Sequence, residues 1–409
     1  MQRHISLTTT EITPVKMPHW DDALLASVDV VCPRNATWSV FELEPLAVFS
    51  EPVTRFVTEL SRRLLLLAHS QPDLAALGFF LRPAALKQAL QQYKHADLMP
   101  LGLTFHLVPS NVPTVAFYSW LAALLQGNSA VVRLSSRRNT VQDAMLDLLN
   151  QMFSEVEWHA IAARVRFVRY QHSNAITEYF SALCFSRVIW GGDNTIREIR
   201  KIPLSAKAKE LCFPDRKSVA VLDSHYLNAL SERDFAQLIQ RLGLDISQFN
   251  QQACASPVLL VWLGEPSTEI WLRFWLALSC QFPDEFADKL EQTVNLQLAA
   301  CDGLISQSVQ FGNLTVAAIS HAADVNFCKF GAGFLVYQIV DELDGWLTQP
   351  ASFQTCVYVG ANKTHLVELV KKSLTMRIDR VCPAGQALAF DWIWDGHAML
   401  SSFSRQFIR

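Results

Sequence analysis

The chain has 409 residues, half of them apolar, with a formal net charge of −3 and a pI near 6.4. This length allows about two to three domains with a sizeable core, and the near-balanced charge argues against a protein built to coat nucleic acid. The nine cysteines are scattered singly without a Cys-x-x-Cys spacing, which indicates reduced thiols and gives no reason to expect a metal site.

Membrane and export signals are also missing from the sequence. No stretch reaches the ~18 consecutive apolar residues of a membrane-spanning helix, and the polar, Thr-rich residues 1–16 lack the apolar core of a secretion signal. We therefore expect a soluble, cytoplasmic protein with no membrane span.

The first 100 residues predict helices rather than strands. Apolar side chains recur at helical spacing around residues 53–69 and 83–93, as in amphipathic helices. We expect this segment to pack on the flank of the sheet that follows.

From residue 103 onward, short apolar runs alternate with helical segments. Strands are expected at residues 103–108, 129–134, 165–170, 187–190 and 218–223, with helices between them. Thr140 and Asp143 have the spacing of a capping box, which predicts a helix that begins there. Strands that alternate with helices in this way predict an α/β fold with a doubly wound parallel sheet.

A second alternation follows residue 223. Strands are expected around residues 258–262, 333–340 and 355–359, and helices around residues 234–242, 268–280 and 283–299. This pattern predicts a second α/β domain. Because ligands of open α/β sheets bind outside the carboxyl ends of the strands, we expect the site in the cleft between the two domains.

Cys254 is the strongest candidate for a catalytic side chain. It stands in the run FNQQACASP at residues 249–257, where small neighbours leave its sulfur approachable. A cysteine is more often a small buried hydrophobe than a nucleophile, so the segment alone is only suggestive. His225 and His321 are the obvious candidates for a partner base, but neither lies in a recognisable motif.

Three strand ends offer candidate cofactor contacts at one edge of the first sheet, although the Gly-x-Gly-x-x-Gly fingerprint is missing. The candidates are Val108, Pro109 and Ser110 after the first strand, Arg133, Ser135 and Ser136 after the second, and Gly191 and Gly192 after the fourth. The arginine and hydroxyls suit an anionic phosphate, but a solvated basic turn explains them equally well. The two glycines would let a ligand approach the backbone closely, and a plain turn explains them equally well.

Four motifs together resemble the aldehyde dehydrogenase superfamily in their order and rough spacing. They are PSNVP (109–113), LQGNSAVVRLS (125–135), WGG (190–192) and QQAC (251–254). They correspond to that family's Pro-Trp-Asn-like turn, its Ala-Gly-Asn…Lys-Pro-Ser stretch, its Thr-Gly-Ser turn and its Gly-Gln-x-Cys nucleophile. The closer resemblance is to the long-chain acyl-CoA reductases of bacterial bioluminescence systems and includes FQT (353–355) and IWDG (393–396). It spans about residues 100–409.

The resemblance implies a two-domain aldehyde-dehydrogenase-like fold. With the element pattern it gives an N-terminal helical segment (1–100) packed on a nicotinamide cofactor-binding domain (101–225), a catalytic domain (226–380) and a C-terminal segment (381–409) that returns to the domain interface. It makes Cys254 the nucleophile. It also makes Asn111 a side-chain donor to the developing oxyanion, beside the backbone N–H of Cys254.

Departures from the oxidising aldehyde dehydrogenases point to a reductase that uses NADPH. Those enzymes carry Glu-Leu-Gly-Gly, with a glutamate that can activate water, whereas Glu210 here is followed by altered residues and is expected to be an exposed side chain. Arg133 replaces a lysine, and Ser136 replaces a glutamate of NAD-preferring members, which favours NADPH. The segment ASFQT (351–355) replaces the Glu-x-Phe-Gly-Pro of the oxidising enzymes, which leaves the nicotinamide-ribose contacts open.

The resulting hypothesis is an NADPH-dependent reductase that converts a fatty acyl thioester, on CoA or on a protein, to a fatty aldehyde through an acyl thioester on Cys254. The resemblance implies an acyl-activating ligase or an acyl carrier protein as a partner, and self-association into a homo-oligomer. Two alternatives stay open. One is a Cys-dependent acyltransferase or thioesterase without nicotinamide, and the other is a non-catalytic acyl-binding scaffold of the same fold.

Overall fold

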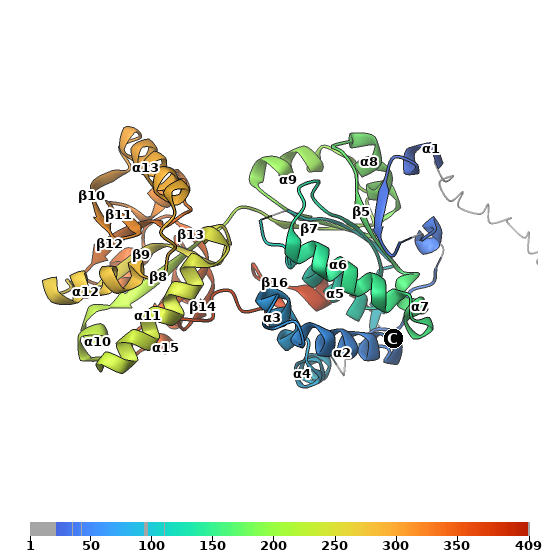
Figure 1. Ribbon diagram of the computed structural model, residues 1–409, viewed down its shortest axis with the longest axis horizontal. Helices are drawn as coiled ribbons and strands as arrows, with labels where there is room; N and C mark the ends of the chain where they lie inside the picture. The colour runs from blue at the N-terminus through green and yellow to red at the C-terminus, as the bar shows by residue number, and fades with distance from the viewer. Residues whose placement is uncertain (1–21, 35, 42, 94–96, 110, 408–409) are drawn as a thin grey trace, which may run out of the picture.

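The computed structural model describes residues 22–407 except residues 35, 42, 94–96 and 110. Two lobes lie side by side in Figure 1, each built around its own sheet. The chain passes from the first sheet to the second over residues 214–216, and the residues after the second sheet return to the first lobe. None of the helices in the described part of the chain is both long enough and apolar enough to cross a membrane.

The first sheet has six strands in the order β1-β5-β4-β3-β6-β7, of which all but β1 run parallel. The strands are β1 Asp29–Cys32, β3 Leu103–Leu107, β4 Ser129–Arg133, β5 Val165–Arg169, β6 Ser186–Trp190 and β7 Lys209–Phe213. The carboxyl ends of β3, β4 and β6 lie next to one another, because β3 pairs with both of the others.

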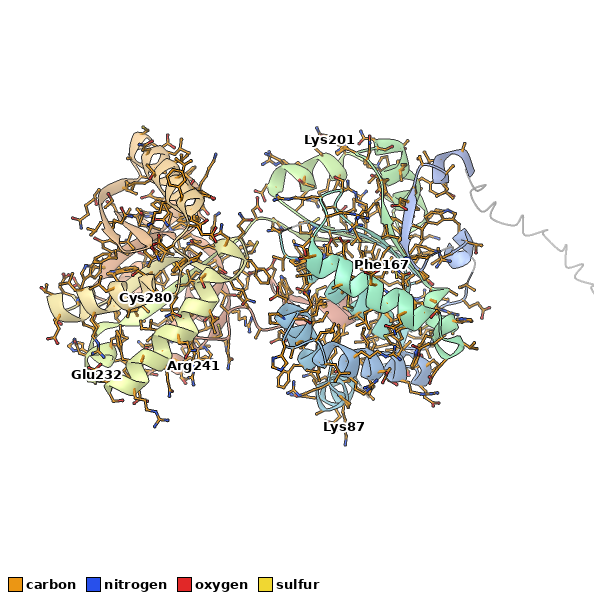
Figure 2. The ribbon with its side chains drawn as sticks, in the orientation of Figure 1. Lys87, Phe167, Lys201, Glu232, Arg241 and Cys280 are labelled. Carbon is orange, nitrogen blue, oxygen red and sulfur yellow. The ribbon has the colours of Figure 1, made fainter. Side chains whose placement is uncertain are left out.

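Helices cover both faces of the first sheet (Figure 1). The helices of this lobe are α1 Asp22–Leu25, α2 Glu51–Leu65, α3 Pro72–Phe80, α4 Pro83–Tyr93, α5 Val115–Leu125, α6 Thr140–Phe153, α7 His159–Ala162, α8 Asn174–Leu183 and α9 Asp193–Arg200. Every residue of α5 is buried because this helix touches the sheet on one side and α2 on the other. Phe167 of β5, labelled in Figure 2, packs in the same core.

The second sheet has seven strands in the order β10-β11-β12-β9-β8-β13-β14, and only the edge strand β10 runs antiparallel to its neighbour. The strands are β8 Lys217–Asp223, β9 Pro257–Leu263, β10 Ile305–Phe311, β11 Leu314–Ile319, β12 Phe334–Val340, β13 Ser352–Val359 and β14 Arg377–Cys382. The helices are α10 Ser224–Ala229, α11 Glu232–Ser247, α12 Thr268–Ser279, α13 Phe286–Cys301, α14 Leu343–Leu347 and α15 Lys363–Lys372.

The C-terminal segment closes back onto the first lobe. It forms the hairpin β15 Ile393–Trp394 and β16 His397–Ala398, then α16 Met399–Ser402 and β17 Ser404–Gln406. Strand β17 pairs antiparallel with β2 Leu98–Pro100, and Met399, Leu400 and Phe403 are fully buried in the core of the first lobe. The hairpin therefore has a fixed place near the boundary of the two lobes.

Two expectations about the first sheet are wrong. The strand expected at 218–223 is β8, which belongs to the second sheet, and the fifth parallel strand of the first sheet is β7. The strand β7 begins with charged Lys209 and Glu210 at the sheet edge and follows a basic segment, so its sequence does not look like a buried strand. Strand β1 also adds an antiparallel edge from the region that was expected to lack strands.

The start of α6 also differs from its prediction. Asn139, rather than Thr140, caps the helix, and its side-chain oxygen accepts from the backbone N–H of Val141 at 2.9 Å and of Gln142 at 3.3 Å. Asparagine is at least as good a cap as threonine, which is why the helix begins one residue earlier than the capping-box spacing suggests.

Candidate active site

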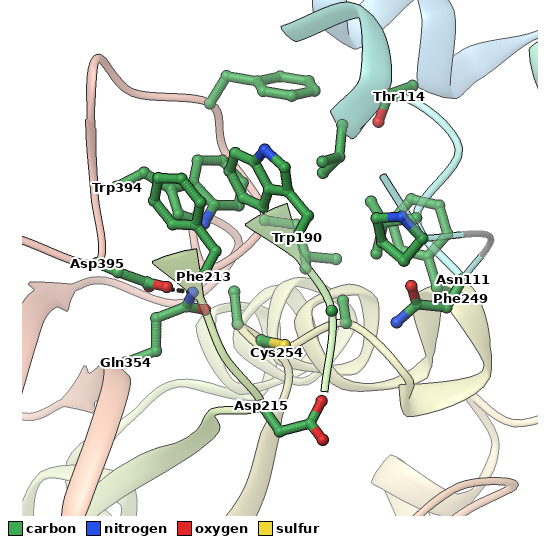
Figure 3. A pocket seen from close by; sticks show the side chains of 18 of the residues that line it. Asn111, Thr114, Trp190, Phe213, Asp215, Phe249, Cys254, Gln354, Trp394 and Asp395 are labelled. Atoms are coloured by element: carbon green, nitrogen blue, oxygen red, sulfur yellow. Dashed lines mark hydrogen bonds between the residues drawn. The ribbon is translucent and has the colours of Figure 1, made fainter. Parts of the chain in front are cut away.

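A cavity of about 370 Å³ lies between the two lobes, at the carboxyl ends of strands of the first sheet. The lining comes from the segments after β3, β6 and β7, the loop before β9, helix α3, Gln354 of β13 and the C-terminal segment. Figure 3 shows Cys254 near its centre, with Asn111 on one side and the pair Gln354 and Asp395 on the other. The predicted nucleophile and the predicted oxyanion donor therefore face the same cavity.

The loop that carries Cys254 has an unusual backbone. Three consecutive residues, Phe249, Asn250 and Gln251, have positive φ angles of 55°, 50° and 64°. Non-glycine residues rarely take this conformation, which costs roughly 1–2 kcal/mol per residue. Contacts from the surrounding protein must hold such a loop in place.

Gln251 supplies one of these contacts. Its side chain is 3% exposed, its Nε2 donates to the carbonyl of Phe334 at 2.8 Å, and its Oε1 accepts from the N–H of Gly333 at 3.1 Å. Phe334 is the first residue of the inner strand β12, and Gly333 directly precedes it. One amide side chain thus fixes the nucleophile loop to the second sheet.

A second contact fixes the backbone of Cys254 itself. The hydroxyl of Ser218 donates to the carbonyl of Cys254 at 2.7 Å and accepts from the N–H of Thr355 at 3.1 Å. Ser218 and Thr355 belong to the neighbouring strands β8 and β13, so these two bonds attach the backbone of Cys254 to the second sheet.

Asn111 lies across the cavity on the other lobe. Its Nδ2 donates to the carbonyl of Gln252 at 3.2 Å, which joins the turn after β3 to the nucleophile loop. The side chain is exposed, so a ligand that enters the cavity can replace this bond. This position fits a donor to an oxyanion that forms next to Cys254.

The thiol of Cys254 is not activated by its surroundings. Burial raises its pKa, and the carboxylates of Asp395 and Asp215 raise the pKa further, while the backbone N–H of Arg216 and the cation of Lys217 lower it. A thiolate is the reactive form of a cysteine. The site therefore requires a group that takes the proton of this thiol.

Trp190 forms a wall of the cavity and is held by a buried polar chain. Its ring stacks on Phe213, with centroids 3.8 Å apart, and its Nε1 donates to the hydroxyl of Ser119 at 3.1 Å. That hydroxyl is 2.7 Å from Nδ1 of His106, whose Nε2 is 2.9 Å from the hydroxyl of Thr104. Burial lowers the pKa of His106 to about 3, so its ring is neutral.

The predicted cofactor residues fall into two groups. Pro109, Gly191 and Gly192 line the cavity, and a Cβ at Gly192 would lie 2.6 Å from a carboxylate oxygen of Asp215, so a larger residue there would have to displace this side chain. Val108 is buried, and its N–H donates to the carbonyl of Arg133 at 3.2 Å.

The second group lies at the end of β4 and does not line the cavity. It consists of Arg133, the half-buried Ser135 and the exposed Ser136, while Ser110 falls outside the described residues. The guanidinium of Arg133 lies 5.2 Å from the ring centroid of Tyr170, and its Nε is buried without a hydrogen-bond partner among the described residues. A phosphate or hydroxyl of a bound nucleotide could accept from this nitrogen.

Glu210 is not the exposed side chain that was expected. It lies on β7 and accepts from Arg187 and Arg200, with its Oε2 2.9 Å from Nε of Arg187 and its Oε1 2.8 Å from Nε of Arg200. Arg187 is 2% exposed. This glutamate therefore neutralises a buried arginine, and it does not line the cavity with Cys254.

The two candidate histidines lie outside the cavity of Cys254. His225 is an exposed residue of α10, and His321 caps a short 3-10 helix, where its Nδ1 accepts from the N–H of Ala323 at 3.2 Å. Neither lines the cavity that holds Cys254.

Several cavity residues were not among the predicted site residues. Asp73 of α3 accepts from Nε2 of Gln248, just before the nucleophile loop, at 2.8 Å. Gln354 donates to the carboxylate of Asp395, which stands at the tip of the C-terminal hairpin. The partners in each pair are far apart in the sequence, so only the fold brings them together. Gln354 and Asp395 lie in the segments FQT and IWDG, which had contributed only to the family resemblance.

Comparison with known families bears on these residues directly. Residues 73–268, which include both Asn111 and Cys254, match the family model described as Acyl-CoA reductase (LuxC). The predicted resemblance to acyl-CoA reductases is confirmed.

Named relatives agree with the family model. The chain is 25% identical over 173 residues to long-chain acyl-protein thioester reductase 2 of Photobacterium leiognathi, a match that covers 42% of this chain and 34% of that protein. It is 24% identical over 186 residues to the long-chain acyl-protein thioester reductase of Photorhabdus luminescens, covering 44% and 36%. The chain thus spans about a third of the length of the curated relatives it matches.

Solved structures extend the likeness to the whole fold. A 1-pyrroline-5-carboxylate dehydrogenase from Thermus thermophilus superposes with a TM-score of 0.64 at 13% identity over 91% of this chain and 83% of that chain. PnpE in complex with nicotinamide adenine dinucleotide superposes with a TM-score of 0.64 at 12% identity over 94% and 88%. The predicted aldehyde-dehydrogenase-like α/β fold is confirmed.

Proposed function

We propose that this chain is a nicotinamide-dependent reductase that converts fatty acyl thioesters to fatty aldehydes through an acyl thioester on Cys254. The observation that carries the proposal is the cavity between the lobes, where an approachable thiol and the amide of Asn111 lie on facing sides. The match to acyl-CoA reductases supports it, since it covers both residues.

Each part of the cavity has a task in this reaction. The sulfur of Cys254 attacks the thioester carbonyl, and the amide of Asn111 and the backbone N–H of Cys254 stabilise the oxyanion. Collapse of the tetrahedral intermediate expels the carrier thiol and leaves the acyl group on Cys254. A bound nicotinamide would supply the hydride that reduces this group, and the thiol is restored as the aldehyde leaves.

The apolar wall of the cavity suits a fatty acyl chain. Trp190, Phe213, Phe249, Phe390 and Trp394 line it. Aromatic side chains bury a large apolar area, and they also exclude water from the acyl group. This favours transfer of hydride over hydrolysis.

Steady-state kinetics with a series of acyl-CoA thioesters test the proposal. We expect consumption of NADPH with trapped fatty aldehyde as product, and its loss in Cys254→Ala. Cys280→Ala is the matched control, because Cys280 is an exposed thiol at the end of α12 (Figure 2). Acyl transfer without NADPH consumption would refute the reductase and favour an acyltransferase or thioesterase.

We further propose that the cofactor is NADPH, held by Arg133, Ser135 and Ser136 at the end of β4 and by Gly191 and Gly192 after β6. The exposed Arg137 and Arg138 follow directly and can face a phosphate. In Ser136→Glu the added carboxylate should repel a 2′-phosphate by about 1 kcal/mol or more at 4 Å. Quenching of tryptophan fluorescence should then show NADPH binding weakened roughly fivefold or more and NADH binding preserved, whereas equal effects on both would contradict the preference.

The natural acyl donor is also part of the proposal. An acyl-CoA or an acyl group on a partner protein, delivered by an acyl-activating ligase or an acyl carrier protein, would reach Cys254 through the same cavity. We also propose that the chain associates with copies of itself into a homo-oligomer. Comparison of acyl-CoA and acyl-protein donors in the same assay distinguishes the two sources.

A further inference from the structure

We propose that Asp395, at the tip of the C-terminal hairpin, is the group that exchanges a proton with Cys254 during acyl transfer. This inference rests on the proposed acylation of Cys254, and it assigns the proton acceptor that the reaction lacks. The glutamate of the oxidising enzymes cannot serve, because Glu210 pairs with two arginines away from the cavity.

The position of Asp395 between two cavities is the first observation. Asp395, Gln354, Trp394 and Ala255 line both the cavity of Cys254 and a second cavity of about 170 Å³. The charged side chains of Asp379 and Arg380 stand in the wall of the second cavity. Asp395 can therefore take a proton on the side of the thiol and release it on the side of these charged groups.

The hairpin holds this carboxyl in a defined place. Asp395 and Gly396 have φ angles of 49° and 74°, the left-handed pair of a tight two-residue turn. One carboxylate oxygen accepts from Nε2 of Gln354, a 6% exposed side chain of β13. The other oxygen remains for a proton, and Oε1 of Gln354 has no hydrogen-bond partner among the described residues.

Charges around the two groups agree with this assignment. Among the charged side chains, Asp395 has the largest effect on the pKa of the Cys254 thiol, which it raises. Asp215 raises this pKa less, and Lys217 lowers it least. Burial also raises the pKa of Asp395, and the charge of Asp379 raises it further. The hydrogen bond from Gln354 and the charges of Arg216 and His397 lower this pKa, but burial outweighs them. A carboxyl whose pKa is shifted toward that of its proton donor is the better general base.

Asp215 is the rival carboxylate, and its position is less suited. It lines the cavity of Cys254, but its side chain is exposed and is directed at Gly192. It does not line the second cavity.

The proposed step balances without any further reactant. The carboxylate of Asp395 takes the proton of the Cys254 thiol while the sulfur bonds to the thioester carbonyl carbon. The tetrahedral intermediate then breaks its bond to the carrier sulfur, and the carboxylic acid of Asp395 returns the proton to that leaving thiolate. The products are the acyl thioester on Cys254, the free carrier thiol and the original carboxylate.

Two rates measured on Asp395→Asn test the step. The asparagine still offers an oxygen to the amide of Gln354, so the hairpin contact is retained. Formation of the acyl adduct on Cys254 from acyl-CoA, without nicotinamide, should slow by about 100-fold or more at pH 7 and recover as the pH rises and the thiol ionises by itself. Alkylation of Cys254 by iodoacetamide should not slow, because removal of a negative charge favours the thiolate.

The controls decide between the possible readings. Asp341→Asn, an exposed carboxyl after β12, should leave both rates unchanged. Three outcomes would overturn the proposal. The first is adduct formation at the wild-type rate in Asp395→Asn, and the second is a parallel loss of adduct formation and alkylation in this variant. The third outcome is slow adduct formation in Asp215→Asn together with fast adduct formation in Asp395→Asn. If the wild-type protein itself forms no adduct, the proposed function fails, and that outcome is distinct from a failure confined to the variants.

Discussion

At the scale of single residues, Cys254 is held in place by side chains whose roles the sequence did not indicate. The QQAC segment predicted Cys254, and its match to Gly-Gln-x-Cys placed Gln251 where that family has glycine. The structure shows why a side chain is useful there. Gln251 keeps the left-handed φ of 64° and adds two hydrogen bonds to the start of β12, a pairing over about 80 positions that no local pattern contains.

Replacement of Gln251 by alanine should lower the free energy of unfolding. The backbone groups of Gly333 and Phe334 would lose their partners in a buried place, at a cost of about 1–3 kcal/mol. Alanine keeps the same strained backbone, so the comparison isolates the side chain. Chemical denaturation measures the loss, and Gln252→Ala, which changes an exposed neighbour, should stay within about 0.5 kcal/mol of the wild type. Equal stability of the two variants would show that the bonds of Gln251 contribute nothing.

At the scale of elements, the first sheet positions one cavity wall through a buried polar chain. Thr104 and His106 of β3, Ser119 of α5 and Trp190 of β6 are joined by hydrogen bonds. The apolar runs of β3, β4 and β6 were predictable from their sequences. Strand β7 was not, because its exposed edge position lets it begin with Lys209 and Glu210, and the apolar run of β8 looked like the next strand of the same sheet.

The neutral state of His106 makes stability depend on pH. Its pKa is about 3 in the folded chain and about 6.5 when unfolded. Between these values only the unfolded chain binds the proton, so the free energy of unfolding should fall by a few kcal/mol as the pH drops from 7 toward 3. His106→Asn should show a shallower fall in pH-dependent denaturation, while His365→Asn, an exposed histidine of α15, should follow the wild type. Identical slopes for His106→Asn and the wild type would contradict this account.

At the scale of the whole molecule, the site exists only where three parts of the chain meet. The first lobe supplies Asn111 and Trp190, the second supplies Cys254, and the C-terminal segment adds Asp395. The cleft position was predictable, because strand ends of α/β sheets bind ligands. The contribution of the C-terminal hairpin to the cavity depends on the burial of Met399, Leu400 and Phe403 in the first lobe. The family resemblance implied that this segment returns to the domain interface, but the sequence pattern did not indicate which residues attach it.

The central claim is that an acyl group passes through Cys254 and leaves as an aldehyde. The most direct measurement is mass spectrometry of the Cys254 peptide after incubation with acyl-CoA alone, followed by addition of NADPH. The account predicts an acyl adduct on Cys254 that accumulates without NADPH and then disappears as an equal amount of fatty aldehyde forms. No adduct, or an adduct that is released as free fatty acid with NADPH unchanged, would contradict it.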